Sequence, residues 1–265
     1  MKKIAIFCVT YHSYRELALY LASIDKAVQY AGDKVEVEVF VADNTDKNIQ
    51  PIEYQAQHFR LNAFVYGRNK GYFGAIGDLM RTADLAVYDY HIISNVDLVM
   101  QEDTLLCLAD YTCANDTGWI APQIYSELEK RDRNPKIMSR YSLRKLQMLE
   151  MLYRFPFLNW LYTKTMYKSK KLQSHEAGQI YAGHGSFIIL TRHYHEHCGT
   201  INYPIFLFGE EIYLAERCLE KHLRVMYVPD IKVIDSEHTS TGKMTDSHYC
   251  RCNYEALRYI TNIFY

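Results

Sequence analysis

The sequence has no linker, no long apolar run and no disulfide framework. Its 6 prolines and 12 glycines are scattered through 265 residues, which argues against a low-complexity linker between two domains. No apolar stretch reaches the roughly 20 residues of a transmembrane helix, and the N-terminal apolar run is too short for a secretion signal. The 7 cysteines are odd in number and irregularly spaced. We therefore expect a single cytoplasmic domain, 1–265, with free thiols.

The chain also lacks an excess of charge of either sign. Its 30 basic and 31 acidic residues give a formal net charge of −1, which argues against nucleic acid as a partner. This balance hides one basic segment. Residues 133–171 hold 10 lysines and arginines and a single acid, Glu150, so that the rest of the chain has 20 basic and 30 acidic residues.

Apolar runs alternate with helical patterns along the first hundred residues. Continuous or alternating apolar positions predict strands at 4–9, 35–43, 61–67 and 91–95, and helical periodicity predicts helices at 14–30 and 71–88. Strands that alternate with helices predict an α/β fold, with a Rossmann-like, mostly parallel central sheet flanked by helices. In the second half, strands are expected at 185–191, 223–228 and 231–235, and helices at 204–222 and at the C-terminal end.

Polar residues follow directly on several of these predicted strands. A parallel sheet binds ligands in the crevice beyond the carboxyl ends of its strands. Asn95 and Asp97 lie two positions apart at one such end, and strand alternation would place both side chains on one face. One carboxylate there suits Mg²⁺ or Mn²⁺, which complete their shell with water and substrate phosphates. His238, after the strand at 231–235, is a candidate second ligand, and a simple turn at 95–97 is the competing interpretation.

Two nucleotide-binding motifs are missing, and one acidic pair is present. No glycine follows the first strand, so the chain lacks the G-x-G-x-x-G fingerprint of a dinucleotide site, and it lacks the Gly-Lys-Ser/Thr end of a P-loop. Glu210 and Glu211 open a predicted helix, where carboxylates gain from the helix dipole. The apolar residues before them favour partial burial, which would raise the pKa of one carboxyl group and make it a candidate base.

Seven short motifs follow one another along the chain. They are VTY (9–11), ADN (42–44), NKGYFGAIG (69–77), NVD (95–97), YAGHGSFIILTR (181–192), GEEIYLAER (209–217) and HTSTG (238–242). In this order they resemble the motifs of the family 2 glycosyltransferases, which are inverting enzymes of bacterial capsule and O-antigen assembly with the GT-A fold. Three positions depart from that pattern: Asn95 replaces an acid, Glu211 stands where Asp is usual, and Tyr213 replaces the second acid of the base motif.

The resemblance implies a role for each matched residue. Six residues would bind the nucleotide-sugar: Thr10, Tyr11, Asp43, Asn69, Gly71 and Asn95. Asp97 and His238 would bind the divalent cation, Mg²⁺ or Mn²⁺, that bridges the diphosphate. Glu211 would deprotonate the acceptor hydroxyl group, with Glu210 as the competing base.

The implied activity is metal-dependent, inverting transfer of a sugar from a nucleotide-diphosphate donor to a hydroxyl group of a saccharide acceptor. The acceptor would be lipid-linked, in the synthesis of capsule, O-antigen or other cell-surface polysaccharide. UDP- and dTDP-sugars are favoured because Asp43 can pair with the imide of uracil or thymine. Two alternatives stay open: a catalytically inactive nucleotide-sugar or carbohydrate binding protein of the same fold, and a nucleotidyltransferase. The latter usually has a glycine-rich basic loop after its first strand, which this chain lacks.

The basic segment lies inside an expected helical insert near 130–178. On this interpretation 1–122 is the nucleotide-sugar-binding half, 123–178 the basic aromatic insert, and 179–265 the acceptor and catalytic half. Within the insert, 141–171 mixes aromatic, aliphatic and basic residues in two short helical stretches, neither long enough to span a bilayer. Peripheral contact with the inner face of the cytoplasmic membrane is one interpretation. A lid over the site or the surface of a homodimer is the other.

Overall fold

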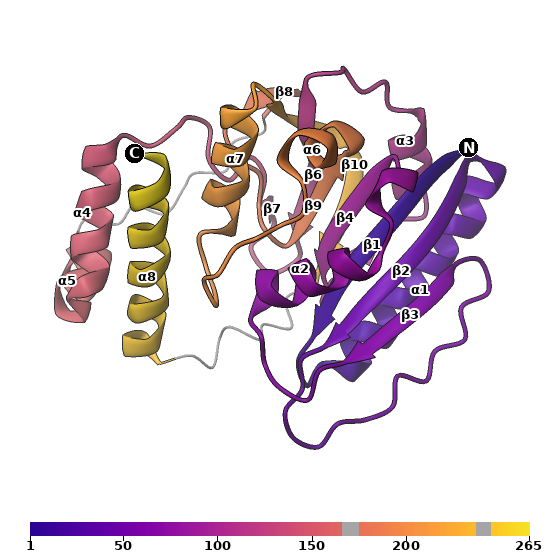
Figure 1. The fold of residues 1–265 in the computed structure, drawn as a ribbon, viewed down its shortest axis with the longest axis horizontal. Coiled ribbons are helices and arrows are strands. Elements are labelled where there is room, and N and C mark those ends of the chain that lie inside the picture. Colours follow the sequence, from indigo (N-terminus) through magenta and orange to yellow (C-terminus); the bar gives the residue numbers. More distant parts are fainter. Residues whose placement is uncertain (166–174, 237–244) are drawn as a thin grey trace.

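A single mixed sheet, flanked by helices, organises the computed structural model, which describes residues 1–165, 175–236 and 245–265 (Figure 1). In these residues ten strands join in the order β3-β2-β1-β4-β9-β6-β10-β5, while β7 pairs with β6 and β8 with β10. The strands are β1 (Lys2–Thr10), β2 (Val35–Asp43), β3 (Arg60–Val65), β4 (Tyr90–Asn95), β5 (Leu98–Met100), β6 (Thr117–Ser126), β7 (Arg131–Asp132), β8 (Gly178–Ile180), β9 (Phe187–Thr191) and β10 (Arg224–Asp235).

The sheet is parallel on its N-terminal side and mixed beyond it. Strands β3, β2, β1 and β4 run parallel to one another, and β6 runs parallel to β10. Strand β9 lies antiparallel between β4 and β6 and joins the two parallel groups. The expected α/β fold with a helix-flanked central sheet is confirmed.

Helices cover both faces of the sheet because its central strands are apolar on both sides. The helices are α1 (Tyr14–Ala31), α2 (Tyr72–Thr82), α3 (Thr104–Asp110), α4 (Leu143–Arg154), α5 (Pro156–Thr165), α6 (Arg192–Cys198), α7 (Glu210–Glu220) and α8 (Asp246–Phe264), with 3-10 turns at η1 (Gly32–Lys34) and η2 (Leu85–Val87). In β1, Ile4 and Ile6 belong to the core under α1, while Ala5 and Phe7 belong to the core under α2 and α7. Each buried aliphatic or aromatic side chain contributes roughly 1.5–3 kcal/mol of transfer free energy.

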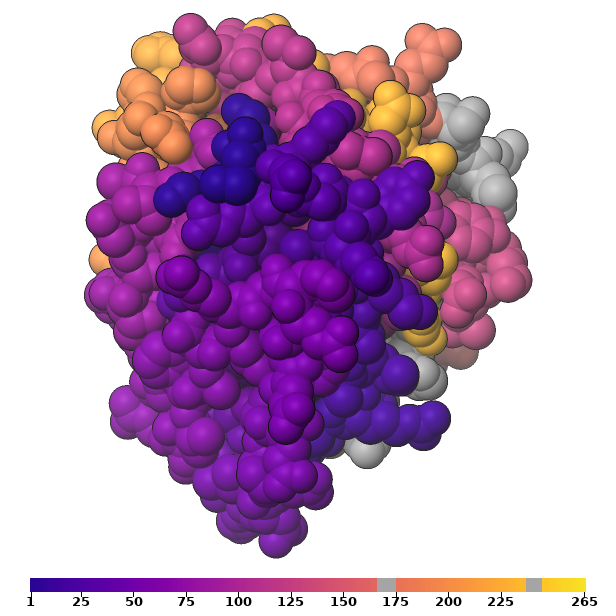
Figure 2. Space-filling view, turned by 90° about the vertical axis from the view of Figure 1, so that its right-hand side faces the viewer, coloured from indigo at the N-terminus to yellow at the C-terminus, as the bar shows by residue number. Residues whose placement is uncertain are grey.

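Helices α4, α5 and α8 stand together at one end of the sheet, on the left of Figure 1. The opposite end is the face shown in Figure 2, where indigo and violet atoms of the N-terminal part of the chain cover most of the surface. Within the described residues no helix is both long and apolar enough to cross a membrane. All seven cysteines fall in the described ranges and all are free thiols, as expected.

The strands expected at 223–228 and 231–235 form one strand, β10, rather than two. Its pairing with β6 shifts register between Val228 and Lys232. Pro229 lies in this interval and has no N–H group to donate to the ladder, which explains the irregularity. The strand resumes its pairing and ends at Asp235.

Strand alternation does not bring Asn95 and Asp97 together, and that premise was wrong. Strand β4 ends at Asn95, and Val96 and Asp97 form a bend before β5. The chain has to bend here because β4 lies between β1 and β9, whereas β5 pairs with β10 at the far edge of the sheet. The turn interpretation of residues 95–97 therefore describes the backbone correctly.

Candidate active site

The carboxyl ends of β1, β2 and β4 meet at one edge of the sheet, and five of the predicted site residues lie there. Thr10 and Asp43 are register partners in the parallel pair β1–β2, and Asn95 pairs with Val9. Asn44 donates its backbone N–H to the carbonyl of Thr10 at 2.9 Å, which extends the β1–β2 contact past the strand end. The strand ends that were expected to border a ligand crevice are thus neighbours in the sheet.

Asp43 is fully buried, and its carboxylate is occupied by the protein itself. One oxygen accepts the hydroxyl of Tyr14 at 2.8 Å, and the other accepts the backbone N–H of Thr45 at 2.9 Å. Next to it, the buried Thr10 hydroxyl has no hydrogen-bond partner. Tyr11 is exposed and its ring lies edge-on to that of His12, with centroids 4.5 Å apart. Tyr11 is thus accessible, whereas both oxygens of Asp43 already accept hydrogen bonds from the chain.

The 69–71 loop is fixed against the same edge by Asn44. The Asn44 side-chain amide donates to the carbonyl of Gly71 at 3.0 Å, and the Asn69 side-chain oxygen accepts the Gly71 N–H at 2.9 Å. Gly71 has φ +75°, and a Cβ there would lie 2.2 Å from the carbonyl oxygen of Phe206. Only glycine fits this position. Asn44 is buried, and its Oδ1 has no partner. Asn44 is part of the motif ADN, but it was not among the predicted site residues.

Asp97 carries a buried oxygen that no protein group satisfies. The backbone N–H of Asn95 donates to the carbonyl of Ser186 at 2.9 Å, and the Asn95 side chain hydrogen-bonds to Asp97. The Oδ1 atom of Asp97 has no partner. Burial, and then the neighbouring carboxylate of Asp235, raise the pKa of Asp97 to about 6.

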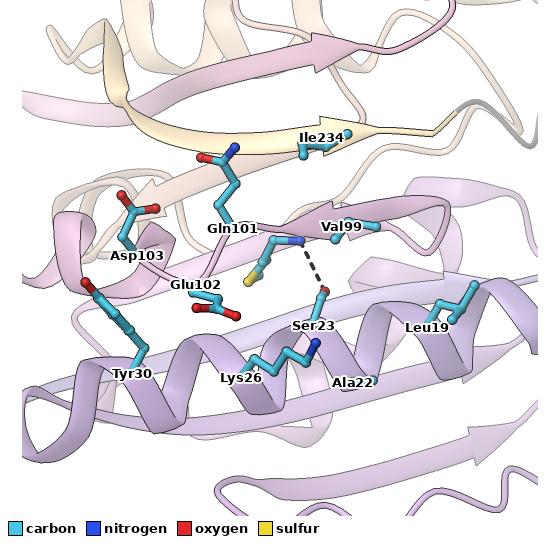
Figure 3. A pocket seen from close by; sticks show the side chains of 11 residues that line it. Leu19, Ala22, Ser23, Lys26, Tyr30, Val99, Gln101, Glu102, Asp103 and Ile234 are labelled. Atoms are coloured by element: carbon cyan, nitrogen blue, oxygen red, sulfur yellow. Dashed lines mark hydrogen bonds between the residues drawn. The ribbon is translucent and has the colours of Figure 1, made fainter.

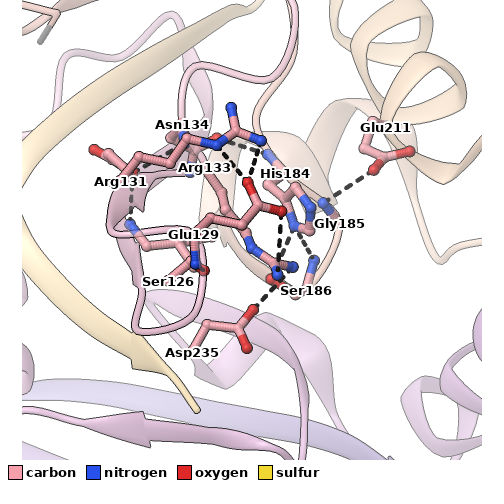
Figure 4. A network of polar contacts seen from close by, with 12 residues as sticks. Ser126, Glu129, Arg131, Arg133, Asn134, His184, Gly185, Ser186, Glu211 and Asp235 are labelled. Carbon is pink, nitrogen blue, oxygen red and sulfur yellow. Dashed lines mark hydrogen bonds and ion pairs between the residues drawn. The ribbon is translucent and has the colours of Figure 1, made fainter. Parts of the chain in front are cut away.

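Asp235 and Arg133 complete this acidic corner and were not predicted. Asp235, the last residue of β10, is buried and pairs with the Nη1 atom of Arg133 at 3.0 Å (Figure 4). Arg133 in turn lowers the pKa of Asp97 and approaches Glu129 at 3.9 Å. The only sequence signal was the position of Asp235 at a predicted strand end, because Arg133 comes from a different part of the chain.

A divalent cation fits this corner. The described residues contain no group of three or more His, Cys, Asp or Glu side chains that could hold a metal ion. His238, the expected second ligand, lies outside the described residues together with the rest of the HTSTG motif. A buried carboxylate oxygen without a partner, next to a second carboxylate, nevertheless matches the oxygen donors that Mg²⁺ and Mn²⁺ take. The unsatisfied oxygen of Asp97 therefore suits a hard divalent cation.

Glu210 and Glu211 begin α7 but face different surroundings. Glu210 is buried, and its Oε1 accepts the backbone N–H of Phe208 at 3.0 Å. Burial, and then the adjacent Glu211 carboxylate, raise the pKa of Glu210, so it keeps its proton to a higher pH than a free glutamate. Glu211 is only partly buried, and its Oε1 accepts the Gly185 N–H at 3.3 Å. A Cβ at position 185 would lie 3.1 Å from that oxygen.

The loop 183–186 links the two acidic centres. Gly185 contacts Glu211, and the next residue, Ser186, accepts the hydrogen bond from Asn95. The Gly185 carbonyl also accepts the hydroxyl of Tyr72, the first residue of α2, at 3.3 Å. The NKG, NVD and GEE motifs are thereby joined through one short backbone segment. This junction is the centre of the candidate site.

A buried carboxylate further along α7 ties the segment before α4 to the C-terminal helix. Glu216 accepts two hydrogen bonds from Arg140, both at 2.8 Å, and one each from the hydroxyls of Tyr181 and Tyr265. The Tyr265 hydroxyl also lies 3.0 Å from the Tyr141 carbonyl. Burial, and then the nearby carboxylate of Glu211, raise the pKa of Tyr141. The entrance to α4 is therefore tied to α7, the helix that carries Glu210 and Glu211.

Two cavities among the described residues lie away from this site. A groove of about 650 Å³ runs between α1, β5 and β10, with Lys26, Tyr30 and Glu102 on its walls (Figure 3). At its floor the Ser23 hydroxyl accepts the Met100 N–H at 3.1 Å. A second hollow of about 390 Å³ lies near Asp89, at the amino end of β4. Neither contains a residue that the sequence predicted for the site.

Comparison with known proteins supports the fold. No protein-family model matches the sequence, and no curated protein matches it. Among solved structures, residues 1–349 of S. aureus TarS in complex with UDP-GlcNAc align with TM-score 0.60 and 13% identity, over 97% of this chain and 65% of that one. GalNAc-T7, solved with UDP, GalNAc and Mn²⁺, aligns with TM-score 0.61 and 12% identity, over 95% of this chain and 47% of that one.

These neighbours are longer than the present chain, which spans 39% of the longer TarS structure at TM-score 0.60 and 13% identity. The expected GT-A fold is confirmed, because these neighbours are GT-A glycosyltransferases. At identities this low the likeness shows the fold alone, and the roles of the site residues stay predictions.

Proposed function

We propose that this protein transfers a sugar from a nucleotide-diphosphate donor to a hydroxyl group, with inversion at the anomeric carbon. The observation that carries the proposal is the junction at 183–186. Gly185 contacts the Glu211 carboxylate, and the neighbouring Ser186 contacts the backbone of Asn95, whose side chain hydrogen-bonds to Asp97, a carboxylate with one buried and unsatisfied oxygen. Glycosyl transfer needs these two functions side by side: a cation site for the leaving diphosphate and a base for the attacking hydroxyl.

The donor is proposed to lie along the carboxyl ends of β1, β2 and β4. Thr10, Tyr11 and Asp43 would contact the base, and the 69–71 loop and Asn95 would lie against the sugar and diphosphate. The exposed ring of Tyr11 supports such contacts, and the buried hydroxyl of Thr10, next to it in the chain, has no hydrogen-bond partner among the described residues. A UDP- or dTDP-sugar is the proposed donor, in line with the UDP-GlcNAc bound by TarS and the UDP bound by GalNAc-T7.

The proposed cation is Mg²⁺ or Mn²⁺, held by Asp97 and His238. When bound, it would neutralise the charge that develops on the diphosphate as it leaves. GalNAc-T7 was solved with Mn²⁺. Burial first, and the neighbouring Asp235 carboxylate second, raise the pKa of Asp97, and a bound cation would offset both effects by favouring the ionised carboxylate.

Glu211 is proposed as the base. Its carboxylate would take the proton from the acceptor hydroxyl while that oxygen bonds to the anomeric carbon. The bond from that carbon to the diphosphate oxygen breaks on the opposite face, so the configuration inverts. The contact of Glu211 with the Gly185 N–H supports this choice over Glu210, which is buried and turned toward Phe208. The acceptor is proposed to be a lipid-linked saccharide of a cell-surface polysaccharide.

One assay separates this activity from its alternatives. The protein is incubated with a panel of UDP- and dTDP-sugars and Mn²⁺, with binding followed by thermal shift and products by chromatography. Transfer or slow hydrolysis that releases UDP or dTDP is expected. Binding without any release would indicate an inactive binding protein. Consumption of a nucleoside triphosphate and a sugar 1-phosphate, with release of pyrophosphate, would indicate a nucleotidyltransferase.

A further inference from the structure

The two helices of the insert each carry an apolar stripe that faces away from the protein. In α4, Leu146 is fully buried and the helix packs on α8. On its outer side Met148, Met151 and Phe155 follow one another at helical spacing, and they are 43%, 51% and 50% exposed. Arg144 lies four residues before Met148 and starts the same stripe.

Helix α5 repeats the arrangement. None of its residues is buried. Phe157 and Trp160 are 68% and 52% exposed and stack on each other, with ring centroids 5.9 Å apart. Leu161 adjoins them on the outer side, and Lys164 ends the stripe three residues later. We call these eight residues the outer stripes: Arg144, Met148, Met151, Phe155, Phe157, Trp160, Leu161 and Lys164.

The charge of these helices is one-sided. Besides the two cations of the outer stripes, α4 carries Lys145 and Arg154, and its one acid is Glu150. The chain as a whole has a net charge of −1, so this end of the molecule is positive while the remainder is negative. Exposed aromatic and aliphatic side chains with cations at the ends of the stripe are the composition of a helix that lies in a lipid interface.

We propose that the outer stripes dock on an anionic lipid surface. Phe157, Trp160 and the α4 residues would enter the interface, and Arg144 and Lys164 would stay at the level of the phosphate groups. Helices of 12 and 10 residues are too short to span a bilayer but long enough to lie in its plane. A second copy of the chain fits less well, because it would set two positive surfaces against each other.

Docking would also orient the candidate site. Tyr141, at the entrance to α4, is joined through Tyr265 to Glu216, which lies on α7, the helix that also carries Glu211. An acceptor carried by a lipid would then reach the base from the surface on which the helices lie. This consequence, unlike the docking itself, rests on the proposed function.

The tryptophans of the chain provide a direct test. There are two, and Trp119 is fully buried whereas Trp160 lies in the outer stripes. The full chain is titrated with vesicles of phosphatidylcholine, with and without phosphatidylglycerol. The mixed vesicles are expected to shift the emission to the blue, protect it from acrylamide and co-sediment the protein, and salt is expected to weaken all three effects. Trp160→Phe should abolish the spectral change while keeping co-sedimentation.

Matched variants distinguish docking through the outer stripes from non-specific binding of exposed apolar side chains to vesicles. The double variant Phe157→Ser, Met151→Ser should bind mixed vesicles at least roughly tenfold more weakly, because it removes two side chains from the interface. The control Val65→Ser, Leu128→Ser removes two exposed apolar side chains elsewhere and should bind normally. Circular dichroism checks that both fold.

Two results would overturn the proposal. One is unchanged emission and recovery in the supernatant with mixed vesicles. The other is a blue shift that grows with protein concentration in the absence of vesicles, together with a dimer in sedimentation velocity, which would assign the surface to a second copy. None of these measurements uses a sugar donor, so a failure here leaves the proposed activity untouched, and the reverse also holds.

Discussion

The two sides of the candidate site are held in place in different ways. On the donor side, Thr10, Asp43 and Asn95 are placed by the register of parallel strands, which many backbone hydrogen bonds share. On the acceptor side, the Glu211 carboxylate is held by one hydrogen bond from a segment far apart in sequence, and the Glu216 carboxylate by the side chains of three distant residues, Arg140, Tyr181 and Tyr265. A geometry that is distributed over a ladder tolerates the loss of any one side chain. A geometry that rests on a few side-chain contacts does not.

The largest effect is expected at the proposed base. Glu211→Gln should keep the fold and donor binding but lower the rate of transfer by roughly 10²–10⁴-fold, because the amide cannot take a proton. Thermal shift with the donor and single-turnover product formation measure the two properties separately. Glu220→Gln, at the exposed end of α7, is the control and should be fully active. An inactive Glu210→Gln beside an active Glu211→Gln would exchange the two roles.

On the donor side, Gly71 lies in a loop outside the strand ladder, so the strand register cannot offset a substitution there. Gly71→Ala places a Cβ 2.2 Å from the Phe206 carbonyl and should lower the free energy of unfolding by about 3 kcal/mol or more. Gly67 also has positive φ but lies in open space, so Gly67→Ala should cost only ~1 kcal/mol for the left-handed backbone. Urea unfolding compares the two variants. Equal losses would show that backbone strain, not the Phe206 contact, decides the position.

On the acceptor side, Arg140→Met tests how far the placement of Glu216 depends on its positively charged partner. It leaves the buried Glu216 carboxylate with two tyrosine hydroxyls and no positive partner, and about 2 kcal/mol of stability should be lost, less than for a fully buried pair because Arg140 is partly exposed. Arg251→Met removes an arginine whose ion pair is exposed, and it should change stability by less than ~0.5 kcal/mol. Similar urea midpoints for the two variants would contradict the distinction.

The smallest effect concerns pH. The pKa of Glu210 is raised in the folded chain above its ordinary value of 4.5, so the folded state binds a proton more tightly than the unfolded state. The stability linked to this group is therefore complete below pH 4.5 and declines as pH rises through the folded pKa. Glu210→Gln should flatten that decline in urea midpoints measured across the range. A decline of the same slope in the variant would place its origin in another group.

The same contrast explains what the sequence could predict. Strands β1 and β2 and helix α1 were expected within about two residues of their ends, because local periodicity determines them. The bend at Asp97 was not expected, since it depends on where β5 finds its partner in the sheet. The Arg133–Asp235 pair and the Arg140–Glu216 contacts could not be read from the sequence, because their partners are separated by 102 and 76 residues. The individual site roles remain predictions for the same reason.

The seven free thiols can report the local unfolding of the two sides of the candidate site. Burial raises the pKa of each, so little of the reactive thiolate forms while its surroundings stay folded. Cys8 lies in the strand β1 of the donor side, and Cys250 and Cys252 lie in α8, which packs on the insert. The rate at which each reacts with an alkylating reagent therefore reports the local unfolding of its own region. The native cysteines therefore allow local unfolding of the donor side and of the insert to be followed separately, without an engineered label.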